Sequence, residues 1–215
     1  MLTLQDRRLY LCVGLRDDMS TFLPAVLEAG VDVVQLREKT HPFEDQLDCA
    51  RLMLKVCRDH GVPFIMNDSP ESALEIGADG VHVGQDDISV ARCREILGTE
   101  AIIGLSTHSD SQFSAALLED ASYLSAGPIV PTPTKPGREG TGLSFAVKSQ
   151  LRSDGPVFVT GGVNLETITE LVEAGLRHFV VVRAITQSNN PGRSAREIRH
   201  ALDNALSAVA VEPTQ

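Results

Sequence analysis

The stretch VDVVQLREKTHPFEDQLDCARLMLKVCRDHGVPFIMND, residues 31–68, carries the pattern that decides the fold. It begins and ends on short apolar runs, Val31–Leu36 and Pro63–Met66. Apolar residues between the two runs are spaced by three and four positions, as one face of an α-helix requires. These residues are Phe43, Leu47, Ala50, Leu54 and Cys57. The stretch therefore predicts a strand, a helix and a second strand.

The same unit repeats along the whole chain. The apolar runs are Leu9–Val13, Val31–Leu36, Pro63–Met66, Val81–Val83, Ala101–Leu105, Tyr123–Ala126, Val157–Thr160 and Phe179–Val182. Short strands that alternate with helices predict either a closed barrel or a doubly wound sheet. The repeat fills the chain evenly, and Gly14-Leu15-Arg16-Asp17 is not the glycine-rich turn of a dinucleotide-binding sheet. We therefore expect an α/β fold, one (β/α)8 TIM barrel domain with parallel strands over residues 1–215, with a loose tail at about 208–215.

Residues that start and stop helices agree with this division of the chain. Ser69 precedes Pro70, which is typical of an N-cap followed by proline in the first turn. The caps expected elsewhere are Thr21 and Asn164 at helix starts and Gly30 and Gly175 at helix ends.

Composition and charge limit the classes of function. The chain has 215 residues, 42% of them hydrophobic and 22% charged, and a formal net charge of −10, which argues against nucleic acid or an anionic membrane as partner. No apolar run approaches the roughly 20 residues that span a bilayer, and the first residues lack a signal-peptide pattern. We expect a cytoplasmic protein whose four cysteines are buried thiols: Cys12, Cys49, Cys57 and Cys93.

Acidic side chains follow two neighbouring strands. In a TIM barrel the chemistry lies at the C-terminal ends of the strands. Asp68 ends one strand, and Asp86 or Asp87 ends the next, at a strand spacing of about 4.8 Å. Two carboxylates so placed suit Mg²⁺, which shares its remaining positions with water and substrate phosphates. The alternative is that Asp68 only begins a turn and caps a helix.

Cations lie on the same rim of an otherwise acidic chain. Arg37, Lys39 and Lys135 follow strand ends, and Lys135 belongs to a proline-rich loop over residues 132–137. Cations beside aspartates indicate a site for a diphosphate and a metal. After the seventh strand, Gly161-Gly162 precedes a helix, where barrels often bind a phosphate through backbone N–H groups. The residues thus predict an enzyme with two anion sites.

Histidines and cysteines suggest no catalytic group of their own. His82 lies within a strand and is expected to be packed, and His108 is near the rim without an evident partner. No Ser-His-Asp arrangement and no cysteine with a neighbouring base can be assembled.

The strand ends resemble one enzyme family in order and spacing, over roughly residues 8–206. The matching segments are QLREK (35–39), ND (67–68), GVHVGQDD (80–87), GLS (104–106) and GPIVPTPTK (127–135). In these segments the chain is similar to thiamine phosphate synthases. The resemblance implies a (β/α)8 barrel and Mg²⁺ as cofactor. It also implies condensation of 4-amino-2-methyl-5-(hydroxymethyl)pyrimidine diphosphate with a thiazole phosphate, giving thiamine phosphate and diphosphate.

The resemblance also implies roles for individual residues. Those expected to hold the pyrimidine diphosphate are Gln35, Leu36, Arg37, Glu38, Lys39, Asn67, Ser106 and Lys135, with Lys135, Ser106 and Arg37 as the catalytic ones. Those expected to hold the thiazole phosphate are Thr132, Pro133, Thr134, Gly162, Val182 and Arg183. Asp68 and Asp87 are expected to bind Mg²⁺.

Two departures from the family pattern accompany this expectation. Arg183 stands where many relatives have Ser, and we expect its side chain to point away from the phosphate; Ser69 stands where Arg is familiar. The other functions that the sequence allows are a thiazole tautomerase on a related barrel, in which Lys39, Asp87 and Lys135 would be idle, and a non-catalytic thiamine phosphate-binding protein. Oligomeric state is left open.

Overall fold

A computed structural model describes residues 4–133, 137 and 139–211. Its strands are β1 (Leu9–Val13), β2 (Val33–Leu36), β3 (Phe64–Asn67), β4 (Gly80–Val83), β5 (Ile102–Thr107), β6 (Tyr123–Ala126), β7 (Val157–Val159) and β8 (His178–Val181). Its helices are α1 (Met19–Glu28), α2 (Phe43–Asp59), α3 (Pro70–Ile76), α4 (Val90–Leu97), α5 (Asp110–Ala116), α6 (Leu143–Arg152), α7 (Ile168–Glu173), α8 (Arg183–Thr186) and α9 (Pro191–Val211).

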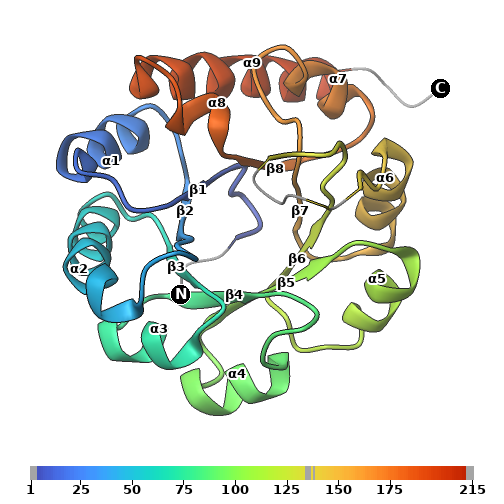
Figure 1. The fold of residues 1–215 in the computed structure, drawn as a ribbon. Coiled ribbons are helices and arrows are strands. Elements are labelled where there is room, and N and C mark those ends of the chain that lie inside the picture. Colours follow the sequence, from blue (N-terminus) through green and yellow to red (C-terminus); the bar gives the residue numbers. More distant parts are fainter. Residues whose placement is uncertain (1–3, 134–136, 138, 212–215) are drawn as a thin grey trace.

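The strands form a closed parallel barrel in sequence order, and the helices lie around its outside (Figure 1). The barrel closes between β1 and β8, where Leu9 is paired with Phe179. The expected TIM barrel is therefore confirmed. Every expected strand is present; β1 and β6 have the expected bounds, and the ends of the others differ by one or two residues.

The helix ends agree with most of the expected caps. The Ser69 side chain accepts a hydrogen bond from the Ser72 backbone N–H, with Pro70 in the first turn of α3. Gly30 and Gly175 have positive φ angles of 103° and 98° just after α1 and α7. Thr21 is a correction: α1 begins at Met19, so Thr21 lies in its first turn.

Asn164 is a second correction: it was expected to cap α7, but the N-cap residue of α7 is Thr167, three positions later. The Asn164 side chain accepts the backbone N–H groups of Glu166 and Thr167, so it closes the turn that leads into the helix. At the other end of the chain, α9 continues to Val211, into the segment expected to be loose; residues 212–215 lie outside the described residues.

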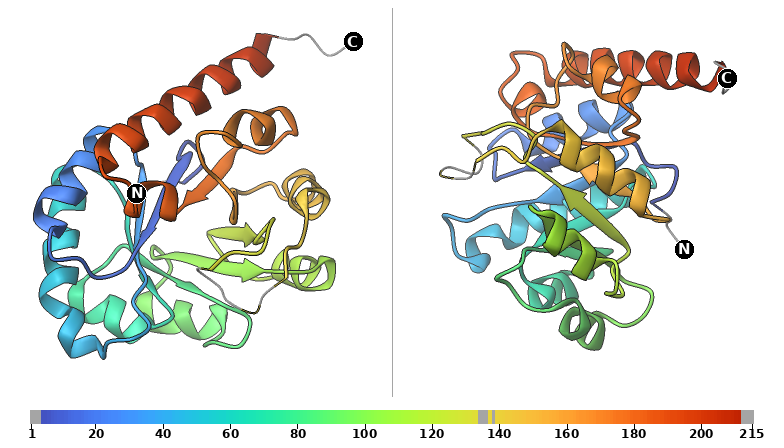
Figure 2. Two further views of the ribbon diagram at one scale, coloured as in Figure 1. Left: turned by 45° about the horizontal axis from the view of Figure 1, so that its top comes forward. Right: turned by 90° about the vertical axis from the view of Figure 1, so that its right-hand side faces the viewer.

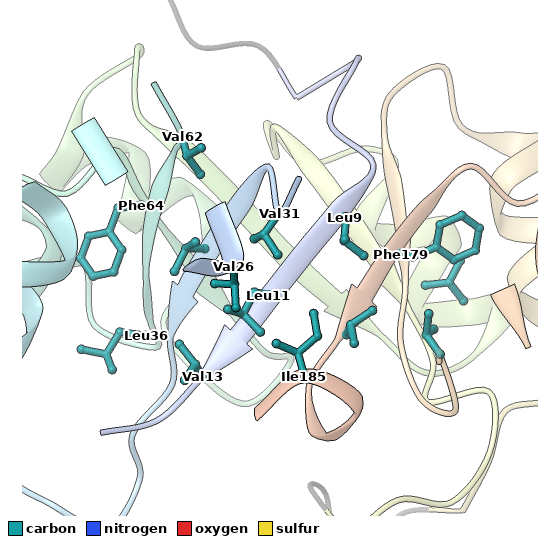
Figure 3. Close-up of a cluster of buried hydrophobic side chains, with 14 of the residues drawn as sticks. Leu9, Leu11, Val13, Val26, Val31, Leu36, Val62, Phe64, Phe179 and Ile185 are labelled. Atoms are coloured by element: carbon teal, nitrogen blue, oxygen red, sulfur yellow. The ribbon is translucent and has the colours of Figure 1, made fainter. Parts of the chain in front are cut away.

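Alternation along the strands divides the interior into two layers. Successive side chains of a strand point to opposite faces, so Leu9, Leu11 and Val13 pack outward against the helices, while Tyr10 points into the barrel. Figure 3 shows part of the outer layer, in which Leu11 lies beside Val26 of α1. Each large apolar side chain buried there contributes roughly 1.5–3 kcal/mol, which makes this layer the main support of the barrel.

The inner layer fills the end of the barrel at which the strands begin. Its buried residues are Leu4, Tyr10, Val33, Ile65, Ile102, Tyr123 and Phe158. These side chains close the barrel from the side of the strand N-termini. Space for a ligand therefore remains at the C-terminal ends of the strands.

A partly buried ion pair joins α9 to the strand ends where the barrel closes. The carboxylate of Asp32 accepts the backbone N–H groups of Arg8 and Leu9, and the Arg199 guanidinium lies 2.8 Å from it. Burial raises the pKa of Asp32 above its ordinary value, against these contacts. Figure 2 shows α9 as a long helix along one side of the barrel, where it packs against α1 and α7. None of the helices in the described residues could span a bilayer, judged by length and apolar character.

Candidate active site

One cavity of about 820 Å³ opens at the C-terminal ends of the strands. Each of the eight strands contributes to its wall, from its last residues or from the residue that follows. The contributing side chains include Cys12, Gln35, Asn67, His82, Ser106, Ser125, Thr160 and Val182. The cavity therefore lies where a TIM barrel carries its chemistry.

Most of the predicted site residues line this cavity. Those that do are Gln35, Arg37, Lys39, Asn67, Asp68, Asp87, Ser106, Thr132, Gly162, Val182 and Arg183. Three others do not line it: Leu36, Glu38 and Pro133. Thr134 and Lys135 lie outside the described residues.

Leu36 and Glu38 are turned away from the cavity by the alternation of β2. Leu36 is 1% exposed and packs in the outer hydrophobic layer. The carboxylate of Glu38 accepts the backbone N–H groups of Leu15 and Thr40, at 3.3 and 2.8 Å, and the Thr40 hydroxyl. Glu38 thereby joins the loop after β1 to the loop after β2. Arg37 and Lys39, on either side of it in sequence, line the cavity.

Hydrogen bonds to Glu38 also fix its charge. Partial burial opposes ionisation, but the contacts with Thr40 and Leu15 outweigh it and lower the pKa of Glu38 to about 2. Hydrogen bonds to a carboxylate favour its charged form. Glu38 is therefore an anion at neutral and at mildly acidic pH.

Amide side chains line one wall of the cavity. The Cys12 thiol donates to Gln35 Oε1 at 3.0 Å, and Gln35 Nε2 lies 3.4 Å from Asn67 Oδ1. Gln35 is 5% exposed, and its amide is held by these two neighbours. An amide with a fixed orientation can present a defined donor and acceptor to a heterocycle.

Sequence reasoning missed a chain of hydrogen bonds that runs through His82. His82 Nε2 lies 2.8 Å from Ser106 Oγ, and His82 Nδ1 lies 2.9 Å from the Tyr123 hydroxyl. Gly104, paired with His82, leaves the space for both rings, since a Cβ there would lie 2.1 Å from Tyr123 Cζ. His82 was expected to be packed; its inward position in the alternation of β4 was the signal that it reaches the cavity.

The acidic rim joins β3 and β4. Lys39 Nζ lies 2.7 Å from Asp68 Oδ2, and Asp87 Oδ2 accepts the Gly84 backbone N–H at 2.7 Å. Asp86 is exposed and lines the same cavity. The helix cap at this point is Ser69 rather than Asp68.

These oxygen donors fit a hard divalent cation. Carboxylates from two adjacent strand ends meet the preference of Mg²⁺, which takes one or two carboxylates and completes its shell with water and phosphate. No group of three or more His, Cys, Asp and Glu side chains with metal-binding geometry occurs in the described part of the chain. A metal held here would therefore depend on a ligand for further oxygens.

The opposite rim is built from glycines and the loop after β6. Gly161 and Gly162 have φ angles of 87° and 78°, and a Cβ on Gly161 would lie 2.5 Å from Pro128 Cβ. Only glycine fits this close approach of two loops. His108 Nδ1 contacts the carbonyl oxygen of Gly127, which is the partner that the sequence did not reveal. Arg183 is exposed at the start of α8 and lines the cavity on this side.

Comparison with known proteins identifies the family. A family model described as thiamine monophosphate synthase matches residues 9–185. The chain belongs to this family. It is 45% identical over 200 residues to a thiamine-phosphate synthase of Acidothermus cellulolyticus, covering 91% of this chain and 94% of the relative.

Further family members agree in length and structure. A thiamine-phosphate synthase of Streptomyces avermitilis is 40% identical, covering 94% of this chain and 96% of the relative. The solved structure of a thiamine phosphate pyrophosphorylase from Pyrococcus furiosus superposes with a TM-score of 0.85 at 25% identity, covering 94% of this chain and 98% of that one. The barrel of the family is thus preserved over nearly the whole chain.

Proposed function

We propose that this chain is a thiamine phosphate synthase, a transferase. It condenses 4-amino-2-methyl-5-(hydroxymethyl)pyrimidine diphosphate with 4-methyl-5-(2-phosphoethyl)thiazole, or its carboxylated tautomer, to thiamine phosphate and diphosphate. With the carboxylated tautomer, CO₂ is released as well. The main support for this activity is that the family model matches residues 9–185. The support from geometry is that Arg37, Lys39, Asp68 and Asp87 line a single cavity.

The diphosphate is bound on the rim of β2 to β4. Arg37 and Lys39 neutralise its charge, as charge-assisted hydrogen bonds do at phosphate sites, and Lys135 joins them from the loop after β6. Asp68 and Asp87 would hold Mg²⁺, which would supply Lewis-acid neutralisation of the leaving diphosphate. Support for these roles is the mixed charge of this rim in a chain with net charge −10.

Pyrimidine recognition rests on hydrogen bonds. The chain has no Trp, and its aromatics make up 4% of the residues. Gln35, oriented by Cys12 and near Asn67, offers its amide to the aminopyrimidine edge. Ser106, contacted by His82, presents its hydroxyl beside it.

The reaction needs alignment and charge neutralisation more than a strong base. The C–O bond to diphosphate breaks, the oxygen keeps the electron pair, and the aminopyrimidine stabilises the resulting cation. The thiazole nitrogen then donates its electron pair to form the new C–N bond. Arg37, Ser106 and Lys135 act on the departing diphosphate, and the cavity holds the nitrogen near the carbon.

The thiazole phosphate is bound on the other rim. Its proposed binding residues are Thr132, Thr134, Gly162, Val182 and Arg183, with Arg183 acting through its backbone N–H. Support comes from the glycine pair after β7, where both residues have positive φ, because barrels often bind a phosphate through backbone N–H groups of this loop.

The alternatives make different use of the rim. A thiazole tautomerase has no need of Lys39 and Asp87, both of which line the cavity. A non-catalytic binding protein would show no turnover. A cytoplasmic location completes the proposal, since the buried thiols of Cys57 and Cys93 suit a reducing compartment.

Incubation of the purified protein with both substrates and Mg²⁺ tests the proposal. Mass spectrometry should detect thiamine phosphate, and diphosphate should be released in equal amount. Omitting the thiazole phosphate or adding EDTA should abolish product formation. Absence of thiamine phosphate with both substrates present would reject the function.

A further inference from the structure

Lys39 and Asp68 form an ion pair at the point where the metal and the diphosphate are proposed to meet. Lys39 Nζ lies 2.7 Å from Asp68 Oδ2, and the two side chains are 51% and 32% exposed. Within the described residues, this is the ion pair that links the β2 loop to the end of β3. One carboxylate proposed as a metal ligand is thus engaged by a cation of the protein itself.

The position of Asp68 is imposed by its backbone. Its φ angle is 64°, and it is the one non-glycine residue with positive φ among the described residues. Asp is one of the few residues that tolerate this conformation. The Asp68 N–H donates to the carbonyl oxygen of His82 at 2.8 Å, which fixes the residue to β4. The carboxylate therefore stays at the rim, and the flexible partner is the long side chain of Lys39.

We propose that Lys39 competes with the metal for Asp68 in the free enzyme and moves to the diphosphate when this arrives. The inference rests on the proposed function and deepens it, because it makes metal and diphosphate binding mutually dependent. Without diphosphate, the ammonium and the divalent cation oppose each other at one carboxylate. With diphosphate, the ammonium has phosphate oxygens to bind, and Asp68 is released to the metal.

Charge explains why Lys39 leaves Asp68 only when diphosphate is present. Two cations close to one carboxylate repel each other. The second proposed metal ligand, Asp87, already accepts the Gly84 N–H with its Oδ2 atom. A diphosphate adds several negative charges between the cations. Ligands that favour each other through a shared group do so reciprocally, so diphosphate should also bind more tightly when metal is present.

Substitution of Lys39 gives an unusual expectation that separates this proposal from a simple phosphate contact. In Lys39→Gln without any diphosphate, Mn²⁺ should bind about three- to tenfold more tightly than in the wild type, measured from the free Mn²⁺ signal in electron paramagnetic resonance. Binding of inorganic pyrophosphate at saturating Mg²⁺, measured by equilibrium dialysis, should weaken. A lysine that only contacts phosphate would leave the affinity for Mn²⁺ alone unchanged.

The matched control is Lys55→Gln. Lys55 pairs with Asp59 at the same distance, 2.7 Å, on the exposed face of α2, and it does not line the cavity. Lys55→Gln removes the same charge but at a position outside the cavity, so Mn²⁺ binding should stay as in the wild type. Equal gains in both variants would overturn the proposal, since they would reflect net charge alone.

A second variant ties the effect to Asp68. The gain in Mn²⁺ affinity should disappear when Lys39→Gln is combined with Asp68→Asn, relative to Asp68→Asn alone. A gain that survives without the Asp68 carboxylate would overturn the proposal. Because Mn²⁺ binding is measured without substrates or turnover, this outcome is independent of whether the protein makes thiamine phosphate.

Discussion

The hydroxyl groups of Tyr10 and Tyr123 lie 2.9 Å apart on the floor of the cavity, joined by a hydrogen bond between β1 and β6. Tyr123 also contacts His82 Nδ1, and His82 in turn contacts Ser106. Burial raises the pKa of both tyrosines above its ordinary value, so both stay protonated. The floor thus supports the orientation of Ser106 through a chain of hydrogen bonds across the barrel.

Tyr123→Phe should lower the free energy of unfolding by about 1–3 kcal/mol, because the buried Tyr10 hydroxyl and the partly buried His82 Nδ1 each lose the hydrogen bond to the Tyr123 hydroxyl. Urea unfolding at neutral pH measures the change. Tyr10→Phe is the control, since it removes only one contact of the Tyr123 hydroxyl. We expect a smaller loss in that variant; an equal or greater loss would contradict the assigned network.

Glu38→Gln should destabilise the protein in a pH-dependent manner. The pKa of Glu38 is lowered from 4.5 to about 2 in the folded state, so its stabilising contribution is complete above about pH 5 and is lost as the pH falls toward 2. The free energy of unfolding of the variant should therefore lie below that of the wild type at pH 7, and the difference should shrink between pH 5 and pH 3.

Urea unfolding of both proteins at pH 7, 5 and 3 measures this difference. Contributions of other carboxylates cancel in the comparison, which isolates Glu38. A difference that stays constant over this range would show that the charge of Glu38 is not what its partners Leu15 and Thr40 stabilise.

Asp87→Asn should raise the Mg²⁺ concentration needed for half-maximal diphosphate release by at least about fivefold, whereas Asp86→Asn should change it little. The amide oxygen of Asn can still accept the Gly84 N–H, so the loop keeps its shape while the ligand charge is lost. Initial rates across an Mg²⁺ titration measure the effect, with thermal melting as a control for folding. Equal losses in both variants would contradict Asp87 as the ligand.

Arg183→Ser should raise KM for the thiazole phosphate less than about fivefold and leave KM for the pyrimidine diphosphate unchanged. The Arg183 guanidinium is exposed and has no ion-pair partner among the described residues. A direct contact with phosphate would contribute at least ~1.5 kcal/mol, or more than tenfold. Steady-state kinetics with each substrate varied in turn measures this, and a loss above tenfold confined to the thiazole substrate would show that the guanidinium grips the phosphate.

Local patterns in the sequence were enough to predict the barrel and the residues on its C-terminal rim. Apolar runs such as Leu9–Val13 and Tyr123–Ala126 coincide with strands. Once the strands are known, parallel order brings their C-terminal ends to one side, which is why the sequence alone assigns Arg37, Asp68 and Ser106 to one rim. The physical reason is that strand alternation and the layout of a TIM barrel depend on neighbouring residues and chain order.

Contacts between side chains far apart in the sequence were decided by the tertiary structure. Tyr10 and Tyr123 are 113 positions apart, and His82 and Ser106 are 24 apart. Their meeting depends on the closed barrel and on the space left at Gly104. Likewise QLREK reads as one binding segment in sequence, yet the pleat of β2 turns Leu36 to the outer core and Glu38 to the loop of Leu15. Sequence specifies which residues reach the rim, whereas the packing of the folded barrel determines which of them face the cavity and which hold the others in position.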